Sequence, residues 1–179
     1  MNMALEEMVS SSEKVKKTGL EPRITIAVRK VYVETSVING LLSRDSRIAL
    51  VSSAFWDRVK AGELEAHISS YVLFELGETF NGKKRDKLLD IASICISDAP
   101  SGVKVEELAF EYVKRTMIPE KYVFDAYHIA SASLGKFEAL VTWNFEHILR
   151  ESTERLLEMI NREKNVFIPR LRSPEVYVW

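Results

Sequence analysis

The sequence predicts an α/β fold with a central, mainly parallel sheet of four to five strands. Short runs rich in β-branched residues alternate along the chain with longer segments whose apolar residues recur at helical spacing. The runs are apolar throughout, as expected for strands that are covered on both faces. This alternation starts after a polar stretch, so we expect an N-terminal extension over residues 1–22 and one domain over residues 23–179.

Five segments have the length and composition expected of strands. They are residues 31–33, 65–69, 94–97, 139–143 and 165–169. Pro169 is expected to end the last strand, because proline cannot donate to a sheet ladder. Residues 24–28 either extend the first strand or form a separate edge strand.

Segments with an apolar stripe at helical spacing lie around and between these strands. Helices are expected over residues 37–42, 48–59, 71–80, 83–92, 105–113, 121–136 and 153–162. Gly62 and Gly135 stand where a helix C-terminus is expected, and Pro119 closes the helix before it.

Composition narrows the classes of function. The chain has 179 residues, 46% hydrophobic and 28% charged, and its net charge is −1, so only a local basic patch could contact nucleic acid. The single cysteine, Cys95, excludes a disulfide framework and is expected to be a buried structural thiol in a reducing compartment. No apolar run approaches the roughly 20 residues that span a bilayer, and the N-terminus lacks a secretory signal, so we expect a cytoplasmic protein. Glycine-rich phosphate loops, a G-x-S-x-G elbow and H-E-x-x-H spacing are absent from the sequence.

Four polar residues stand where expected strands end or where the next helices begin. Glu34 ends the first strand, and Glu75 lies one turn into the helix after the second. Asp125 opens the apolar stripe of a later helix. Asn144 ends the strand expected over residues 139–143, which follows that helix in the chain. Sites in parallel α/β sheets form beyond the carboxyl ends of strands, where the strand order reverses. We therefore expect these side chains to meet at one edge of the sheet.

The chemistry of these side chains indicates a metal site. Three carboxylates at close range repel one another and raise each other's pKa values, and a divalent cation removes that conflict. Mg²⁺ or Mn²⁺ favours carboxylate, amide oxygen and water ligands, and supports attack of water on a phosphodiester. Taken singly, each residue has an ordinary interpretation as a strand end, an exposed helix position, a helix-start acid or a turn residue. Their shared placement favours the site.

Polar neighbours of the acids have two interpretations each. Thr35 and Ser36 either cap the following helix or orient Glu34, and the two roles are compatible. His128 could assist the site, but a hydrogen-bonded packing role is favoured. His147 either touches phosphate or caps its local turn.

Basic residues near the acids could hold a phosphate backbone. The candidates are Lys83, Lys84, Arg85 and Lys87 after the Glu75 helix, and Arg44 and Arg47 before it. The alternative for each is an ordinary solvated position.

Four sequence blocks resemble the motif blocks of PIN-domain proteins, a family that includes the VapC-type toxin ribonucleases. The blocks are VYVETSVI, ISSYVLFELGE, DAYHIASA and LVTWNFEHI. They have the family order and approximate spacing over residues 31–168. The last two blocks together are the specific part of the resemblance, whereas ETS alone is weak.

The resemblance implies a PIN-like α/β/α sandwich that cleaves single-stranded RNA with Mg²⁺ or Mn²⁺. Glu34, Glu75 and Asp125 match the three acids, and Asn144 falls where many members have a fourth. The implied partners are a small antitoxin protein and a second copy of the chain. Phe55 and Trp56 could supply the dimer contact, and core packing is their alternative.

Two differences from the family pattern support another hypothesis. The first acid is usually aspartate and is Glu34 here, and the fourth position is the neutral Asn144. Because Mg²⁺ demands near-ideal octahedral geometry, both changes could weaken the site. The alternative is a catalytically weak PIN-like RNA-binding or scaffold protein. A flavodoxin-like or receiver-like domain is disfavoured, because its acidic pair, its threonine or serine and its lysine do not fall on the corresponding strands.

Overall fold

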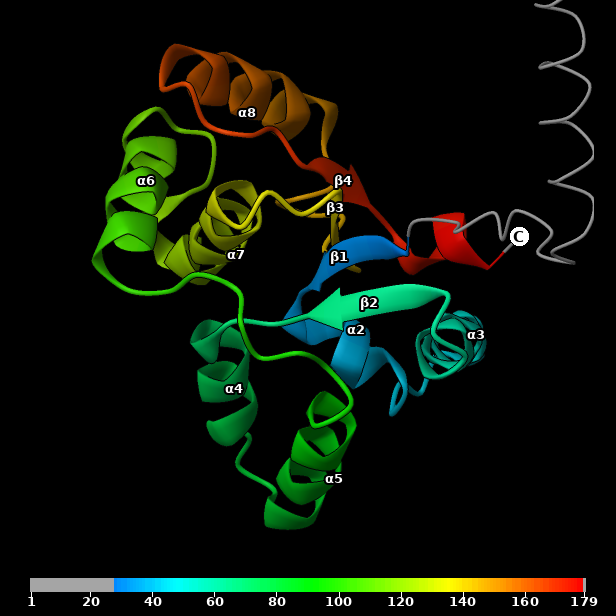
Figure 1. Ribbon diagram of the computed structural model, residues 1–179. Coiled ribbons are helices and arrows are strands. Elements are labelled where there is room, and N and C mark those ends of the chain that lie inside the picture. The colour runs from blue at the N-terminus through cyan, green and yellow to red at the C-terminus, as the bar shows by residue number, and fades with distance from the viewer. Residues whose placement is uncertain (1–27, 179) are drawn as a thin grey trace, which may run out of the picture.

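A computed structural model describes residues 28–178 of the chain (Figure 1). The extension expected over residues 1–22, and most of the segment 24–28, lie outside the described residues. Within the described part, no helix has the length and apolar character needed to cross a membrane.

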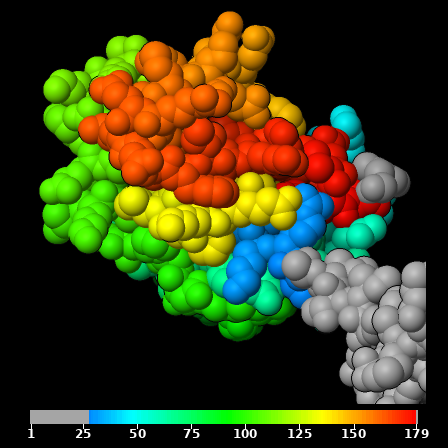
Figure 2. Space-filling view, turned by 45° about the horizontal axis from the view of Figure 1, so that its top comes forward, coloured from blue at the N-terminus to red at the C-terminus, as the bar shows by residue number. Residues whose placement is uncertain are grey.

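A parallel sheet of four strands, in the order β2-β1-β3-β4, forms the centre of the fold. The strands are β1 (Arg29–Val33), β2 (Leu64–His67), β3 (Ala139–Val141) and β4 (Arg170–Arg172). The predicted α/β fold with a parallel central sheet is thereby confirmed. Because β2 and β3 lie on opposite sides of β1, the strand order reverses at the carboxyl end of β1. In Figure 2, the segments that contain β4, β3 and β1 follow one another in red, yellow and blue.

Helices cover both faces of the sheet. The α-helices are α2 (Thr35–Gly40), α3 (Ser46–Lys60), α4 (Ser70–Gly77), α5 (Gly82–Ala92), α6 (Val103–Lys114), α7 (Val123–Leu134) and α8 (Glu151–Glu163), and two 3₁₀ turns are η1 (Glu120–Tyr122) and η2 (Pro174–Tyr177). Figure 1 shows α2 and α3 on one side of the sheet and α6, α7 and α8 on the other, while α4 and α5 pack beside α2.

The core contains the residues that were considered for a dimer contact. Phe55 is 0% exposed and Trp56 is 1% exposed, and their rings meet edge to face at 5.6 Å between centroids. Both side chains, on α3, belong to the core, so core packing is confirmed for them and a dimer contact through them is wrong. Cys95 is half-buried against the same core, and burial raises the pKa of its thiol to about 12.

The strand expected over residues 94–97 is reduced to one bridge between Ile96 and His67. The backbone N–H groups of Ile94 and Cys95 bond back to the end of α5, to Ile91 and Ala92. These amides cannot pair with β2 as well, so a continuous strand does not form.

The last strand lies after Pro169 and not before it. The segment before the proline is bound to the end of α8, where the Asn161 side chain donates to the Phe167 carbonyl at 2.7 Å. The β4 strand begins at Arg170, whose N–H bonds to the Glu138 carbonyl at 3.1 Å. Pro169 therefore precedes the strand, a position that needs no N–H donor.

Candidate active site

Glu34 lies where β1 ends beside β3. Its backbone N–H donates to the Val141 carbonyl at 3.0 Å, which continues the sheet pairing by one residue. It stands at the N-cap position of α2, but its side chain makes no capping bond. The carboxylate instead accepts hydrogen bonds from Ser36 and from Thr142, the latter at 2.8 Å, and Glu34 is only 6% exposed. The site therefore holds a buried carboxylate between the ends of two strands.

The same hydroxyls tie the two strand ends together. Ser36 accepts from the Trp143 N–H at 2.8 Å, and Thr142 accepts from the Asn144 N–H at 2.9 Å. Ser36 and Thr142 thus each bond to Glu34 and to backbone beyond β3. Ser36 therefore orients the Glu34 carboxylate, as expected, whereas the Thr35 hydroxyl donates to Glu75 and not to Glu34.

Glu75 projects from α4 toward Glu34. Its Oε2 atom accepts from the Thr35 hydroxyl and lies 2.7 Å from His128 Nε2. Burial alone would raise the pKa of Glu75, but the hydrogen bond and charge of His128, together with Thr35, lower it below its ordinary value. The structure therefore keeps Glu75 ionised at neutral pH.

His128 is fully buried and connects Glu75 to the core. Its Nδ1 atom lies 2.7 Å from the Tyr32 hydroxyl, which in turn lies 2.7 Å from Ser69 Oγ. Burial lowers the pKa of His128, but the bond to Glu75 and the charges of Glu34, Glu75 and Asp125 raise it overall. Tyr32 and Ser69 were not singled out from the sequence. The only sign of this pair in the sequence is Tyr32 itself, a polar-tipped residue between two valines at the end of β1.

Glu34, Glu75 and His128 form a set of metal-ligand type. Each offers one ligand atom, and these atoms lie within 4.8 Å of one another, in the one such group found among residues 28–178. Two of the three are carboxylates, the ligands that Mg²⁺ and Mn²⁺ prefer, and no lysine or arginine within residues 28–178 bonds to them. The donor set therefore fits a divalent cation. Asp125 does not belong to this set, although it was expected as the third ligand.

Asp125 lies in the first turn of α7, next to the set but facing β3. Its Oδ2 atom accepts from Asn144 Nδ2 at 2.9 Å, and His147 Nδ1 is 3.3 Å from the same oxygen. Burial and the negative charge of Glu34 raise the pKa of Asp125 to about 6, against the opposing effects of His128, His147 and Asn144. Asp125 can thus exchange a proton near neutral pH.

Asn144 positions Asp125 and uses both ends of its amide. The side-chain oxygen accepts from the His147 N–H at 2.9 Å while the nitrogen donates to Asp125. The oxygen that was expected to ligate a metal is therefore turned toward the backbone. The His147 ring packs on the Tyr122 ring at 3.7 Å between centroids and lies beside Asp125.

Two adjoining hollows bring the acids and part of the basic set together. The first, of about 720 Å³, is lined by Glu34 and Glu75 together with Arg44 and Lys84. The second, of about 440 Å³, is lined by Leu42, Arg44, Asn81, Lys83, Lys84 and Lys87. Leu42, Arg44 and Lys84 line both hollows, so the two hollows are neighbours.

The candidate basic residues differ in their partners. Among the described residues, Arg44, Lys83, Lys84 and Lys87 form no ion pair. Arg47 instead pairs with Glu175 at 2.6 Å, and Arg85 is 3.9 Å from Asp86 and lines neither hollow. The hollow beside the acids therefore carries uncompensated positive charge.

Comparison with known proteins gives structural likeness alone. Neither protein-family models nor curated protein sequences match this chain. The fold is similar to the crystal structure of FitAcB from Neisseria gonorrhoeae, with a TM-score of 0.49 and 16% identity over 80% of this chain and 97% of that one. It is similar to the same degree to VapBC2 from Rickettsia felis, solved with a DNA fragment from the promoter, over 80% of this chain and 98% of that one. No activity or partner follows from similarity at this level.

Proposed function

We propose that this chain is a divalent-metal-dependent endoribonuclease of the PIN type that cleaves single-stranded RNA. The observation that carries the proposal is the convergence of Glu34, Glu75 and His128 within 4.8 Å at the reversal point of the sheet. The four-block sequence resemblance and the adjoining basic hollow support the same conclusion.

Glu34 and Glu75 would hold Mg²⁺ or Mn²⁺, with Asp125 close by. The ion, when bound, would lower the pKa of a bound water and stabilise charge on the phosphate. Ser36 and Thr142 keep the Glu34 carboxylate in one orientation, and Thr35 does the same for Glu75. Asp125 is suited to accept a proton, because its pKa of about 6 lies near neutral pH.

The free cations of the second hollow would bind the RNA backbone. Arg44 and Lys84 stand at the boundary with the acidic hollow, and Lys83 and Lys87 continue the basic lining. A strand whose phosphates contact Arg44 and Lys84 would reach the hollow that Glu34 and Glu75 line. Phosphate contacts of this kind hold the strand without selecting its sequence.

Cleavage of labelled single-stranded RNA tests the proposal. We expect cleavage with Mn²⁺ or Mg²⁺, none with excess chelator, and a loss of about a hundredfold or more in Glu75→Gln and in Asp125→Asn. Glu78→Gln is the matched control, because Glu78 is exposed one turn further along the chain and lies outside the acidic set. Cleavage that persists in chelator, or that survives Glu75→Gln unchanged, would contradict the mechanism.

The second candidate function is a catalytically weak RNA-binding or scaffold module. The observation in its favour is the bond between His128 and Glu75, because this bond occupies an oxygen that a metal would need. Retention of several RNAs without cleavage, in the parent chain and in Asp125→Asn alike, would establish this alternative.

We also propose two protein partners from the sequence resemblance to VapC-type toxins. An antitoxin would cover the acidic hollow and block RNA, and a second copy of the chain would form a homodimer. Inhibition of RNA cleavage by a small protein encoded next to this chain would establish the first partner. The proposed homodimer needs a contact surface other than Phe55 and Trp56.

A further inference from the structure

Phe80 lies in the bend between α4 and α5 and presents its ring to solvent. It is fully exposed, more so than any other large hydrophobic side chain among residues 28–178. In the same part of the chain, no pair of aromatic rings includes Phe80. The next residue, Asn81, lines the basic hollow beside the acidic site. The ring can therefore contact a ligand at the edge of this hollow.

The backbone on both sides of Phe80 is held by hydrogen bonds. The Thr79 N–H donates to the Leu76 carbonyl at 3.1 Å, just after α4. Asn81 then caps α5, because its side-chain oxygen accepts from the Lys84 N–H at 3.0 Å. The exposed ring thus stands on a fixed bend, which reduces the entropy that is lost when it contacts a ligand.

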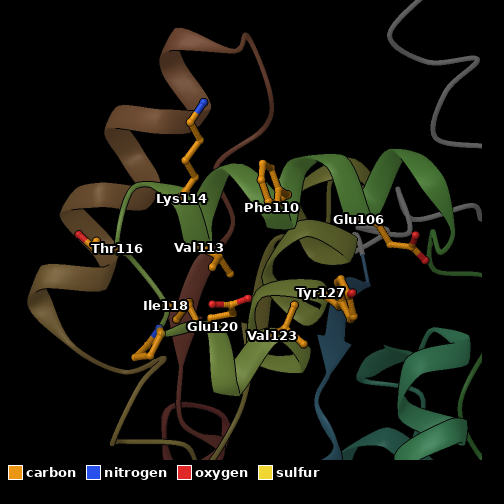
Figure 3. Close-up of a pocket in the computed structure, with 10 residues that line it drawn as sticks. Glu106, Phe110, Val113, Lys114, Thr116, Ile118, Glu120, Val123 and Tyr127 are labelled. Carbon is orange, nitrogen blue, oxygen red and sulfur yellow. The ribbon is translucent and has the colours of Figure 1, made fainter.

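Phe110 provides a comparison, because its ring is exposed in a different setting. It is 64% exposed, and Figure 3 shows it on α6, above Val123 of α7. The pocket that it lines contains the carboxylates Glu106 and Glu120, which repel phosphates. Single exposed apolar side chains are ordinary on protein surfaces. The feature that distinguishes Phe80 is therefore the charge of its surroundings.

The hollow next to Phe80 is lined by cations and by no carboxylate. Its charged residues form no ion pair among residues 28–178, and they are Arg44, Lys83, Lys84 and Lys87. A lining of this kind attracts a polyanion. An exposed aromatic ring beside it offers a flat apolar contact, as a nucleotide base does. A nucleic-acid strand matches both features within one nucleotide, because each phosphate is followed by a base.

We infer that Phe80 is a base-stacking residue, on which one base of the substrate strand lies while neighbouring phosphates contact the basic hollow. The inference rests on the proposed binding of single-stranded RNA and names a group that selects it. In a duplex each base is paired and stacked on its neighbours, whereas an unpaired base can turn outward onto an aromatic ring. The substrate class is therefore RNA with an unpaired nucleotide at Phe80. Any base is accepted there, since every base has a π-face.

RNA binding in excess chelator tests the inference without cleavage. Phe80→Ala is expected to weaken the binding of single-stranded RNA about tenfold, whereas Phe80→Trp keeps the affinity of the parent chain. Phe110→Ala is the matched control, because it removes an exposed phenylalanine ring that lines neither the acidic nor the basic hollow. Duplex RNA of the same length should bind the parent chain and Phe80→Ala equally. Circular dichroism verifies that the variants are folded.

Salt dependence and an abasic strand separate stacking from charge. Phe80→Ala removes no phosphate contact, so the slope of log affinity against log salt concentration should stay that of the parent chain. A reduced slope would show that the substitution acts through Lys83 and Lys84, and would overturn the stacking role. A strand of the same length made of abasic spacers keeps the phosphates and lacks the bases. It should bind the parent chain and Phe80→Ala with equal affinity.

The outcomes separate the stacking role from the proposed nuclease. A parent chain that binds no RNA refutes both. RNA binding that Phe80→Ala leaves unchanged refutes the stacking role alone, and is the result expected if the ring contacts a protein. An equal loss of affinity for the intact and the abasic strand also refutes stacking. Cleavage is measured separately with Mn²⁺, so a chain that binds RNA through Phe80 without cleaving it supports the stacking role and contradicts the nuclease.

Discussion

Asn144→Asp tests whether Asn144 holds Asp125 through its amide. The Asn144 nitrogen donates to Asp125 Oδ2 at 2.9 Å, and an aspartate at this position would place a second carboxylate against the first. The variant therefore loses a donor and gains a like charge where burial and Glu34 already raise the pKa of Asp125 to about 6. We expect the two acids to share one proton at neutral pH.

The magnitude follows from the distance and the pKa. Two unit charges about 4 Å apart repel by roughly 4 kcal/mol at an effective dielectric constant near 20. The pair avoids part of this repulsion by binding a proton. Protonation costs about 1.4 kcal/mol for each unit by which the pKa of the carboxyl lies below the solution pH. We expect the metal-free variant to lose about 2–3 kcal/mol at pH 7, which is roughly 5–10 °C in melting temperature for a chain of this length.

Thermal unfolding with and without Mn²⁺ measures this loss. A carboxyl whose pKa is raised in the folded state stabilises the fold below its unfolded pKa, and that stability is lost as the pH rises through the folded pKa. The variant should therefore regain stability between about pH 7 and pH 5, and gain more from Mn²⁺ than the parent chain because a fourth carboxylate is present. Asn165→Asp is the control, since Asn165 is exposed after α8. A variant as stable as the parent at pH 7 without metal would refute the role of Asn144.

Three further outcomes follow from other contacts. Alkylation of Cys95 at pH 8, monitored by mass spectrometry, should be about a thousandfold slower in the folded protein than in protein unfolded in urea, because burial raises the pKa of the thiol to about 12. Equal rates in the two states would contradict the burial. Lys84→Ala should weaken RNA binding for all sequences and should reduce the slope of log affinity against log salt concentration by about one phosphate contact. Arg85→Ala, which lines neither hollow, should leave affinity and slope unchanged. Identical salt slopes for the two variants would count against the basic hollow. Tyr32→Phe should cost about 1–3 kcal/mol in urea unfolding, because it leaves the buried His128 Nδ1 without its partner; an unchanged midpoint would dispute that bond.

The sheet could be predicted where burial is encoded locally. The apolar runs that became β1, β2 and β3 carry their own signal, since a strand covered on both faces must be apolar throughout. The position of β4 carries no such signal. The run before Pro169 is as apolar as a strand, but the side chain of Asn161, on α8, binds its backbone at Phe167. A contact of this kind cannot be read from composition.

The acids and one of their partners, Ser36, could be located from the sequence, but the other partners could not. Placement after strands brings Glu34 and Glu75 into one hollow, as the strand-end argument requires. The place of His128 in the metal-ligand set depends on α4 and α7 packing together, which helical spacing alone does not reveal. The same holds for Asn144, whose amide orientation is set by the His147 N–H and by Asp125.

The two differences from the PIN pattern act on different parts of the site. The longer Glu34 is held by Ser36 and Thr142 in a buried position, so its extra methylene is accommodated by fixed hydroxyl partners. The neutral Asn144 supplies a donor to Asp125, which a fourth acid could not do without binding a proton.

Charge balance supports the proposed metal site with three acids. Glu34, Glu75 and Asp125 carry three negative charges when ionised, and these charges, together with the bond to Glu75, raise the pKa of His128. A divalent cation held by Glu34 and Glu75 would offset two of the three negative charges. An acid in place of Asn144 would leave an uncompensated charge in a buried place, and such a charge is costly. The neutral residue at position 144 therefore keeps the buried negative charge of the site below that of a four-acid site, while its amide still donates to Asp125.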